Sequence, residues 1–241
     1  SLTNSYVIIS NSLNLEFCDN EIIFNDQSKS CGCIKSNQYQ DHKYQRNLFK
    51  NAYVDLVKNS AGIDESNSDG SNRIEITDCT FDCISGPSEG RCFHINFAQD
   101  LANIIINNIM VLNCPLGGIF IKLEFVLEYQ MFTFNNFQFI NNSINDNSFN
   151  ELQICPQIFI QNKMNGNLPF PITLDFQNCL FQNNYSPKKG GALSYGKNKF
   201  NSNTKLLFND CHFINNRAEE GGSALSFIKP SKIGSQILIK C

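Results

Sequence analysis

Apolar and polar residues alternate along much of this chain, and one short version of that pattern recurs five times. Each copy reads apolar, any residue, Asn or Asp, apolar, any residue, apolar. Side chains alternate faces along a strand, and Asn and Asp tolerate a left-handed backbone, so the pattern predicts two half-buried strands that meet at a tight bend. The copies span residues 76–81, 106–111, 134–139, 176–181 and 208–213.

The Asn or Asp at the centre of each copy is expected to form the bend. These residues recur about every 30 positions, a period typical of stacked coils, and a glycine-marked strand follows most copies. One longer gap holds an Asn-rich insertion, which should be a surface excursion. The sequence thus predicts an all-β solenoid with three short faces per coil. The expected bend ladder is Asp78, Asn108, Asn136, Asn178 and Asp210.

The first 72 residues show the pattern only loosely. They are expected to form an N-terminal cap or irregular first coil followed by a polar loop, with a short helix over residues 48–57, where the apolar spacing suits one. Residues 73–241 are assigned to the repeats. The last residues, 237–241, look like the opening strand of a further coil, so we expect this end to be open or truncated.

Two short motifs within the repeats resemble a known family. The ranges 139–142, 181–184 and 213–216 match F-x-x-N, and 190–193 matches G-G-A-[ILV], of the polymorphic outer-membrane-protein repeat. Residues 221–225 depart from the second motif by one inserted Ser. The resemblance implies the right-handed parallel β-helix of the pectin-lyase-like superfamily, whose members of this kind are typically surface adhesins and structural passengers.

Composition argues against some partners. The chain has 241 residues, of which 17% are charged, with 19 Lys and Arg against 22 Asp and Glu and no basic run. Nucleic-acid binding needs clustered cations, so it is not expected. Asn, Gln and Ser supply most of the polar surface, which suits stacking or glycans. Phe is abundant at 21 residues and is assigned to the core.

Cysteine content indicates the compartment. Eleven cysteines favour an oxidising environment, so we expect a secreted or cell-surface protein with disulfides. Cys83 and Cys114 occupy nearly equivalent places in adjacent repeats, and Cys18 could pair with Cys31 or Cys33 to hold the cap. The cysteine spacings do not match a zinc site, and no metal or cofactor is expected.

Two acceptor triplets for N-glycosylation begin at Asn141 and Asn184, each just after a repeat. No apolar stretch is long enough to span a bilayer, and none resembles a signal peptide. Both observations fit a mature extracellular segment.

Candidate catalytic residues are few. Asp78 and Asp210 occupy bend positions, where a carboxylate bonds the turn backbone. Glu219 and Glu220, beside Arg217, form the best remaining acidic site, although a solvated turn is the favoured interpretation of them. We therefore expect a non-enzymatic extracellular structural or adhesive protein that self-associates through its coil ends into a filament or surface layer. The alternatives are a polysaccharide lyase or hydrolase and a glycan- or protein-binding surface module.

Overall fold

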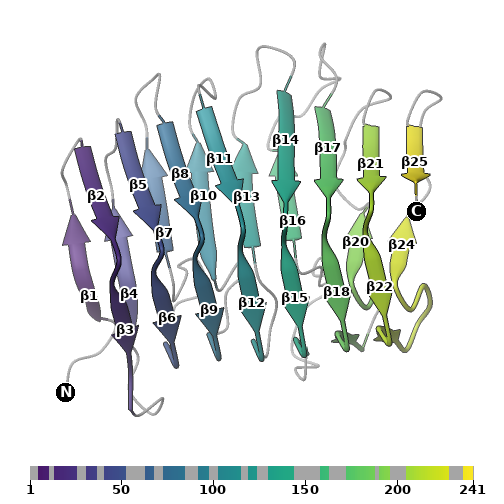
Figure 1. Cartoon of the computed structure of the whole chain (residues 1–241), viewed down its shortest axis with the longest axis horizontal. Coiled ribbons are helices and arrows are strands. Elements are labelled where there is room, and N and C mark those ends of the chain that lie inside the picture. Colours follow the sequence, from purple (N-terminus) through teal and green to yellow (C-terminus); the bar gives the residue numbers. More distant parts are fainter. Residues whose placement is uncertain are drawn as a thin grey trace.

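The computed structural model describes residues 5–10, 14–25, 31–36, 41–52, 63–67, 73–84, 92–97, 103–114, 119–123, 130–143, 158–162, 172–187, 190–195, 205–227 and 236–240. Its described regular structure is all β, in parallel strands, and these residues include no helix. Figure 1 shows the strands side by side along one long axis, with the two termini at opposite ends. Among the described residues, no helix has the length and apolar character needed to cross a membrane.

Three parallel sheets hold most of the strands. Sheet A consists of Ser5–Ser10 (β1), Cys31–Ser36 (β4), Ile63–Asn67 (β7), Phe93–Phe97 (β10), Ile119–Leu123 (β13) and Ile158–Asn162 (β16). Sheet B consists of Asn14–Cys18 (β2), Asp41–Gln45 (β5), Arg73–Thr77 (β8), Asn103–Asn107 (β11), Gln130–Asn135 (β14), Ile172–Gln177 (β17), Lys205–Asn209 (β21) and Gln236–Lys240 (β25). Sheet C consists of Glu21–Ile23 (β3), Leu48–Lys50 (β6), Thr80–Asp82 (β9), Met110–Leu112 (β12), Gln138–Ile140 (β15), Leu180–Gln182 (β18) and His212–Ile214 (β22).

The chain visits sheets A, B and C in turn, and we call one such passage a coil. Coil 1 is β1 to β3, coil 4 is β10 to β12, and coil 6 is β16 to β18. In coils 7 and 8 the first face is a separate two-stranded sheet of Leu193–Tyr195 (β20) and Leu225–Phe227 (β24). A further small sheet pairs Tyr185–Ser186 (β19) with Arg217–Ala218 (β23). Within each sheet, a strand thus pairs with its equivalents in the neighbouring coils.

Left-handed residues make the bends between sheets B and C. Asp78, Asn108, Asn136, Asn178 and Asp210 all have φ between 52° and 56°. A second left-handed residue ends the sheet C strand in six coils, at Asn51, Cys83, Asn113, Asn141, Asn183 and Asn215. Five of these six are Asn, the residue that accepts this conformation most readily after glycine.

The interior is a set of aromatic stacks that run along the coil axis. Phe134, Phe176 and Phe208 follow one another, with ring centroids 4.8 and 4.9 Å apart. Phe139 and Phe181 form a second stack, which continues to Phe213. These separations match the roughly 4.8 Å spacing of paired strands, because register places identical residues directly above one another. The Phe residues that recur in the sequence therefore stack on one another in the core of successive coils.

The N-terminal region differs from the expected helical cap. Leu48 to Lys50, the start of the expected helix, are strand β6, and Phe49 stacks on Phe81 at 5.0 Å. Strand β6 has only three residues and is followed by the left-handed Asn51. Its period-two alternation is therefore too short to be distinguished from helical spacing over residues 48–57. Residues 53–62 lie outside the described residues. Strand β5 lies within the first 72 residues and pairs with β8, which begins at Arg73. The expected cap region therefore contributes strands to the same sheets as the repeats.

Candidate functional site

Buried asparagines support the bend after sheet C. Asn184 is 1% exposed, and its side-chain amide Nδ2 donates to the Phe139 carbonyl oxygen at 2.9 Å and to Asn216 Oδ1 at 2.9 Å. Its own Oδ1 accepts from the backbone N and from Nδ2 of Asn142, both at 3.1 Å. Asn142 in turn donates to the Val111 carbonyl at 3.0 Å. The Asn of each F-x-x-N motif is therefore a rung of an internal ladder.

Cysteines occupy the inward position after the other bend, between sheets B and C, in three coils. The Cys179 thiol donates to the Phe134 carbonyl at 3.2 Å, and the Cys211 thiol donates to the Phe176 carbonyl at 3.4 Å. Cys79 lies in the same place and is fully buried. Burial raises the pKa of the Cys79 thiol to about 11, so it stays protonated and can donate. These thiols are core hydrogen-bond donors.

Two bends in the first coils were not predicted from the sequence. Asp19 and Arg46 are left-handed, and each is followed by an inward Asn. Asn47 donates to the Phe17 carbonyl at 2.7 Å, and its Oδ1 accepts from the backbone N of Asn20 at 3.0 Å. The signal was present, because residues 17–20 read F-x-x-N and residues 44–47 read Y-x-x-N.

The two predicted glycosylation sites differ in exposure, because Asn141 is exposed and Asn184 is buried. Asn141 is exposed at its bend, and its Nδ2 makes one hydrogen bond, to Asn113 Oδ1, at 3.4 Å. Asn184 is the buried ladder residue described above, so a glycan on its Nδ2 is incompatible with the folded coil. The prediction of a glycan at Asn184 is therefore wrong, whereas glycosylation of Asn141 stays a prediction.

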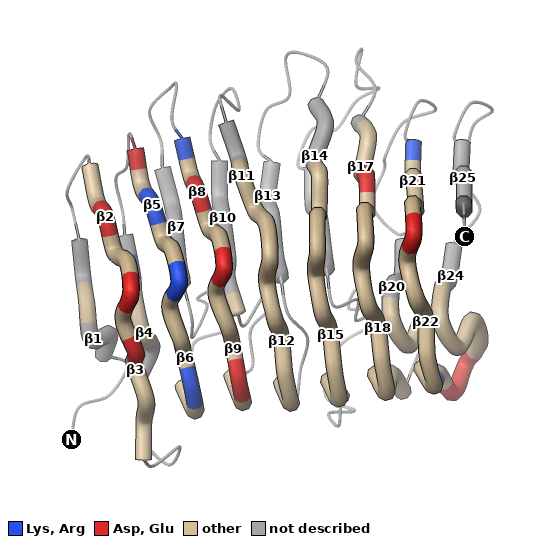
Figure 2. Tube along the Cα trace, in the orientation of Figure 1, with Lys and Arg blue, Asp and Glu red and all other residues tan. Residues whose placement is uncertain are grey.

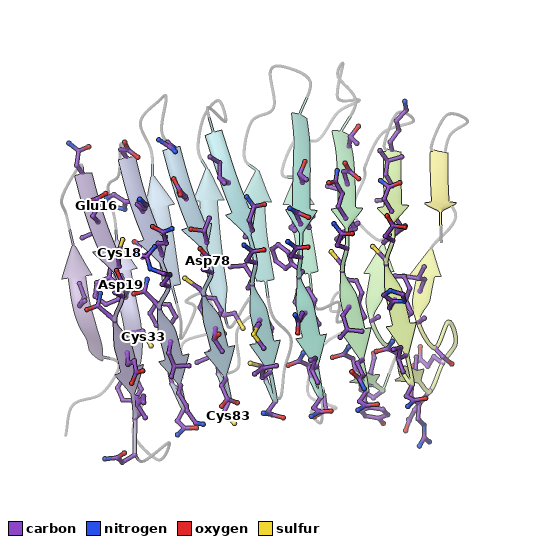
Figure 3. The ribbon with its side chains drawn as sticks, in the orientation of Figure 1. Glu16, Cys18, Asp19, Cys33, Asp78 and Cys83 are labelled. Atoms are coloured by element: carbon purple, nitrogen blue, oxygen red, sulfur yellow. The ribbon has the colours of Figure 1, made fainter. Side chains whose placement is uncertain are left out.

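The expected disulfides are not formed in the structure. None of Cys18, Cys33, Cys83 and Cys114 is in a disulfide, and the side chain of Cys31 lies outside the described residues. Cys83 is out of register with Cys114, because the backbone N of Cys83 bonds Leu112 at the bend of Asn113. Cys114 is inward and buried, whereas Cys83 is half-buried. Figure 3 shows Cys83 at the opposite end of strand β9 from the Asp78 bend.

The pairing of Cys18 with Cys33 is likewise absent. Cys18 follows the inward Phe17 on sheet B and is partly exposed, whereas Cys33 on sheet A is fully buried. The Cys33 side chain therefore lies in the coil interior, and the Cys18 side chain lies on the other side of its strand. Figure 3 shows Cys18 beside the Asp19 bend.

Outward amides link neighbouring coils at the bends. Asn108 Nδ2 donates to Asp78 Oδ1 at 2.8 Å, and Asn136 Nδ2 donates to Asn108 Oδ1 at 2.9 Å. Asn178 Nδ2 reaches Asn135 Oδ1 at 3.4 Å. Each carboxamide has two donor hydrogens and two acceptor lone pairs, so the row keeps capacity for hydrogen bonds to a partner.

Sheets B and C carry an uncharged outer surface across coils 4 to 6. Strands β11, β12, β14, β15 and β18 contain no charged residue, and the one carboxylate of β17, Asp175, is 4% exposed. Figure 2 shows this band between two sections that carry charges. We call it the uncharged wall. Its outer residues are Asn107, Asn108, Met110, Leu112, Asn135, Asn136, Gln138, Ile140, Gln177, Asn178, Leu180 and Gln182.

Asp175 is held by amides. Gln177 Nε2 donates to Asp175 Oδ2 at 2.6 Å, and Asn209 Nδ2 donates to Asp175 Oδ1 at 3.1 Å. These bonds compensate its burial in part and keep its charge off the surface.

Charge pairs stabilise the first coils instead. Arg46 binds Asp19 through two nitrogen–oxygen contacts, and Lys50 Nζ lies 2.8 Å from Asp82 Oδ2. Burial raises the pKa of the Asp82 carboxyl, but hydrogen bonds from Lys50, Asn113 and its neighbours outweigh burial and leave that pKa below its ordinary value. These outer positions favour water, in contrast to the uncharged wall.

The acidic candidate near the C-terminal coils lies in an exposed turn. Tyr185 Oη donates to Glu219 Oε1 at 2.6 Å, and the Arg217 guanidinium lies 5.9 Å from the centre of the Tyr185 ring. Glu219 and Glu220 are both exposed. The Tyr185 bond also occupies the Glu219 carboxylate, so this arrangement serves to hold β19 against β23. In the portion of the chain that the structure describes, no group of three His, Cys, Asp or Glu side chains could hold a metal ion.

No protein-family model, curated protein or solved structure matches this chain.

Proposed function

We propose that this chain is an extracellular structural and adhesive protein, folded as a right-handed parallel β-helix, that self-associates through its uncharged wall. Crossover connections between parallel strands are almost always right-handed. The resemblance to the polymorphic outer-membrane-protein repeat supports the same fold, because F-x-x-N supplies the inward Asn of the ladder.

The uncharged wall is the observation that carries the proposal. Depletion of charged residues marks the core of protein interfaces, and aliphatic residues such as Leu112, Ile140 and Leu180 add apolar area there. Asn and Gln rows at strand spacing can pack against identical rows of a second copy, as in steric zippers. The charged coils on either side stay hydrated and limit the contact to the middle of the molecule.

End contacts are a second route to assembly. The two large hydrophobic residues that are exposed in the described chain are Ile23, at 48%, and Ile214, at 42%. They lie on β3 and β22, the two outermost strands of sheet C. An outermost strand presents unpaired backbone groups to any strand that can pair with it, and head-to-tail contacts of that kind build filaments.

Negative-stain electron microscopy of the purified protein over a range of concentrations tests both routes. We expect ordered strings or layers for the native sequence, loss of lateral contacts in Ile140→Lys, and shorter assemblies in Ile23→Lys. Asp41→Lys, at an exposed position on β5, is the matched control and should assemble normally. Monodisperse rods at every concentration would refute self-association, and such rods that bind a glycan array would instead assign a glycan-binding module.

A further inference from the structure

Two cysteines of coil 4 approach each other inside the core. Cys92 directly precedes β10 on sheet A, and Cys114 follows the left-handed Asn113 at the end of β12. Their Sγ atoms are 3.8 Å apart, and both side chains are fully buried. The contact therefore joins the start of a coil to its end, at the corner between sheets A and C.

Cys114 stands where later coils carry the ladder asparagines. Its backbone N donates to Asn142 Oδ1 at 2.9 Å, so it lies at the head of that ladder. The thiol has only weak acceptors, the carbonyls of Leu112 at 3.3 Å and Phe81 at 3.8 Å. The backbone N of Ile84 donates to Cys114 Sγ at 3.4 Å, and a disulfide sulfur can still accept that bond. Replacing the thiol hydrogen by a second sulfur thus disturbs little.

We propose that Cys92 and Cys114 form a disulfide that closes coil 4 into a covalent ring. The inference rests on the extracellular setting proposed above. A disulfide has an S–S distance of about 2.05 Å, so the sulfurs must approach by about 1.8 Å when the bond forms. The equivalents of Cys114 in coils 5, 6 and 7 are asparagines, so the covalent ring belongs to coil 4 and not to those coils.

The chemistry is thiol–disulfide exchange with a low-molecular-weight disulfide such as oxidised glutathione. The Cys114 thiolate attacks one glutathione sulfur, forms a mixed disulfide and releases the other glutathione thiolate. The Cys92 thiolate then attacks the Cys114 sulfur and releases the second glutathione. Two protein thiols are oxidised, one glutathione disulfide is reduced, and the two protons pass to the released thiolates. Because both cysteines are buried, the exchange takes place while coil 4 closes during folding.

Peptide mapping of the full chain tests this link directly. The protein is refolded in a glutathione redox buffer, its free thiols are alkylated in denaturant, and it is digested with trypsin. Cleavage after Arg91 and Lys122 leaves both cysteines in the one peptide 92–122, whereas Cys83 falls in the peptide 74–91. We expect peptide 92–122 to be unalkylated and lighter by two hydrogen masses until it is reduced. Alkylation of both cysteines, or a cross-link to peptide 74–91, would overturn the proposal.

Two variants complete the test. Cys92→Ser should leave Cys114 alkylated, and the matched control Cys83→Ser should keep the link in peptide 92–122. Reduction should lower the denaturation midpoint of the native sequence and of Cys83→Ser, but not that of Cys92→Ser; equal shifts in all three would contradict the ring. A linked protein that forms no assemblies in the microscope would refute the proposed self-association and leave the disulfide standing.

Discussion

Replacing Asn184 by Ala should be among the most damaging single changes to a polar residue of this chain. The substitution removes the partners of two buried backbone groups, the Phe139 carbonyl and the Asn142 N–H, which bond Asn184 at 2.9 and 3.1 Å. Leaving a buried polar group unpaired costs about 1–3 kcal/mol. The expected loss in the free energy of unfolding is therefore about 2–6 kcal/mol, the sum for the two groups.

Asn183→Gly is the matched control for this change. Asn183 is the exposed neighbour with φ of 54°, a conformation that glycine adopts freely, so the substitution loses only the surface bond to Asn141. Its effect should stay within about 0.5 kcal/mol. Asn184→Cys should fall between the two, because cysteines donate to the same class of carbonyl at Cys179 and Cys211.

Urea unfolding followed by far-ultraviolet circular dichroism measures the three variants. Hydrogen exchange in the segment around Asn142 gives a local readout, since its N–H loses its acceptor in Asn184→Ala. If Asn184→Ala loses no more stability than Asn183→Gly, and the Asn142 amide stays protected, the ladder does not support the bend and the reasoning fails.

Three further predictions concern other residues. Expressed through a secretory pathway, the folded protein should carry a glycan at Asn141 and none at Asn184, so Asn141→Gln alone should remove the mass increment seen in mass spectrometry. Asp82, whose pKa lies below its ordinary value of 3.8, should contribute stability above that value that is lost as pH falls through the lower folded pKa; Asp82→Asn should flatten this part of the pH profile of unfolding. Cys79, with its pKa raised to about 11, should resist alkylation at neutral pH until the protein is unfolded.

Each of these has an outcome that contradicts it. A glycan on Asn184 in soluble, folded protein would mean that the ladder residue can leave the core. An acid profile unchanged in Asp82→Asn would show that its pairing with Lys50 does not stabilise the fold. Rapid alkylation of native Cys79 would show that the thiol is not held in the interior.

Local pattern was enough to predict the repeating bends and the inward aromatic residues. Period-two alternation around an Asn or Asp depends only on backbone conformation and on which face a side chain takes, and both are local. A related signal, an aromatic residue with Asn three positions later, exists at residues 17–20 and 44–47, where it was overlooked because short strands sit in a polar stretch. The helix expected at Leu48 failed for a related reason, since a three-residue strand followed by a bend gives spacing that also suits a helix.

The positions of the cysteines, the buried asparagines and the uncharged wall were decided by tertiary structure. In the pair Asn183 and Asn184 the two residues are chemically identical, yet the left-handed bend turns the first outward and the second into the core. The same one-residue difference separates Cys83 from Ile84, the true equivalent of Cys114. The sequence by itself determined that the chain bends and what fills its coils. Register between coils about 30 residues apart decided which side chains meet, because those contacts exist only once one coil is stacked on the next.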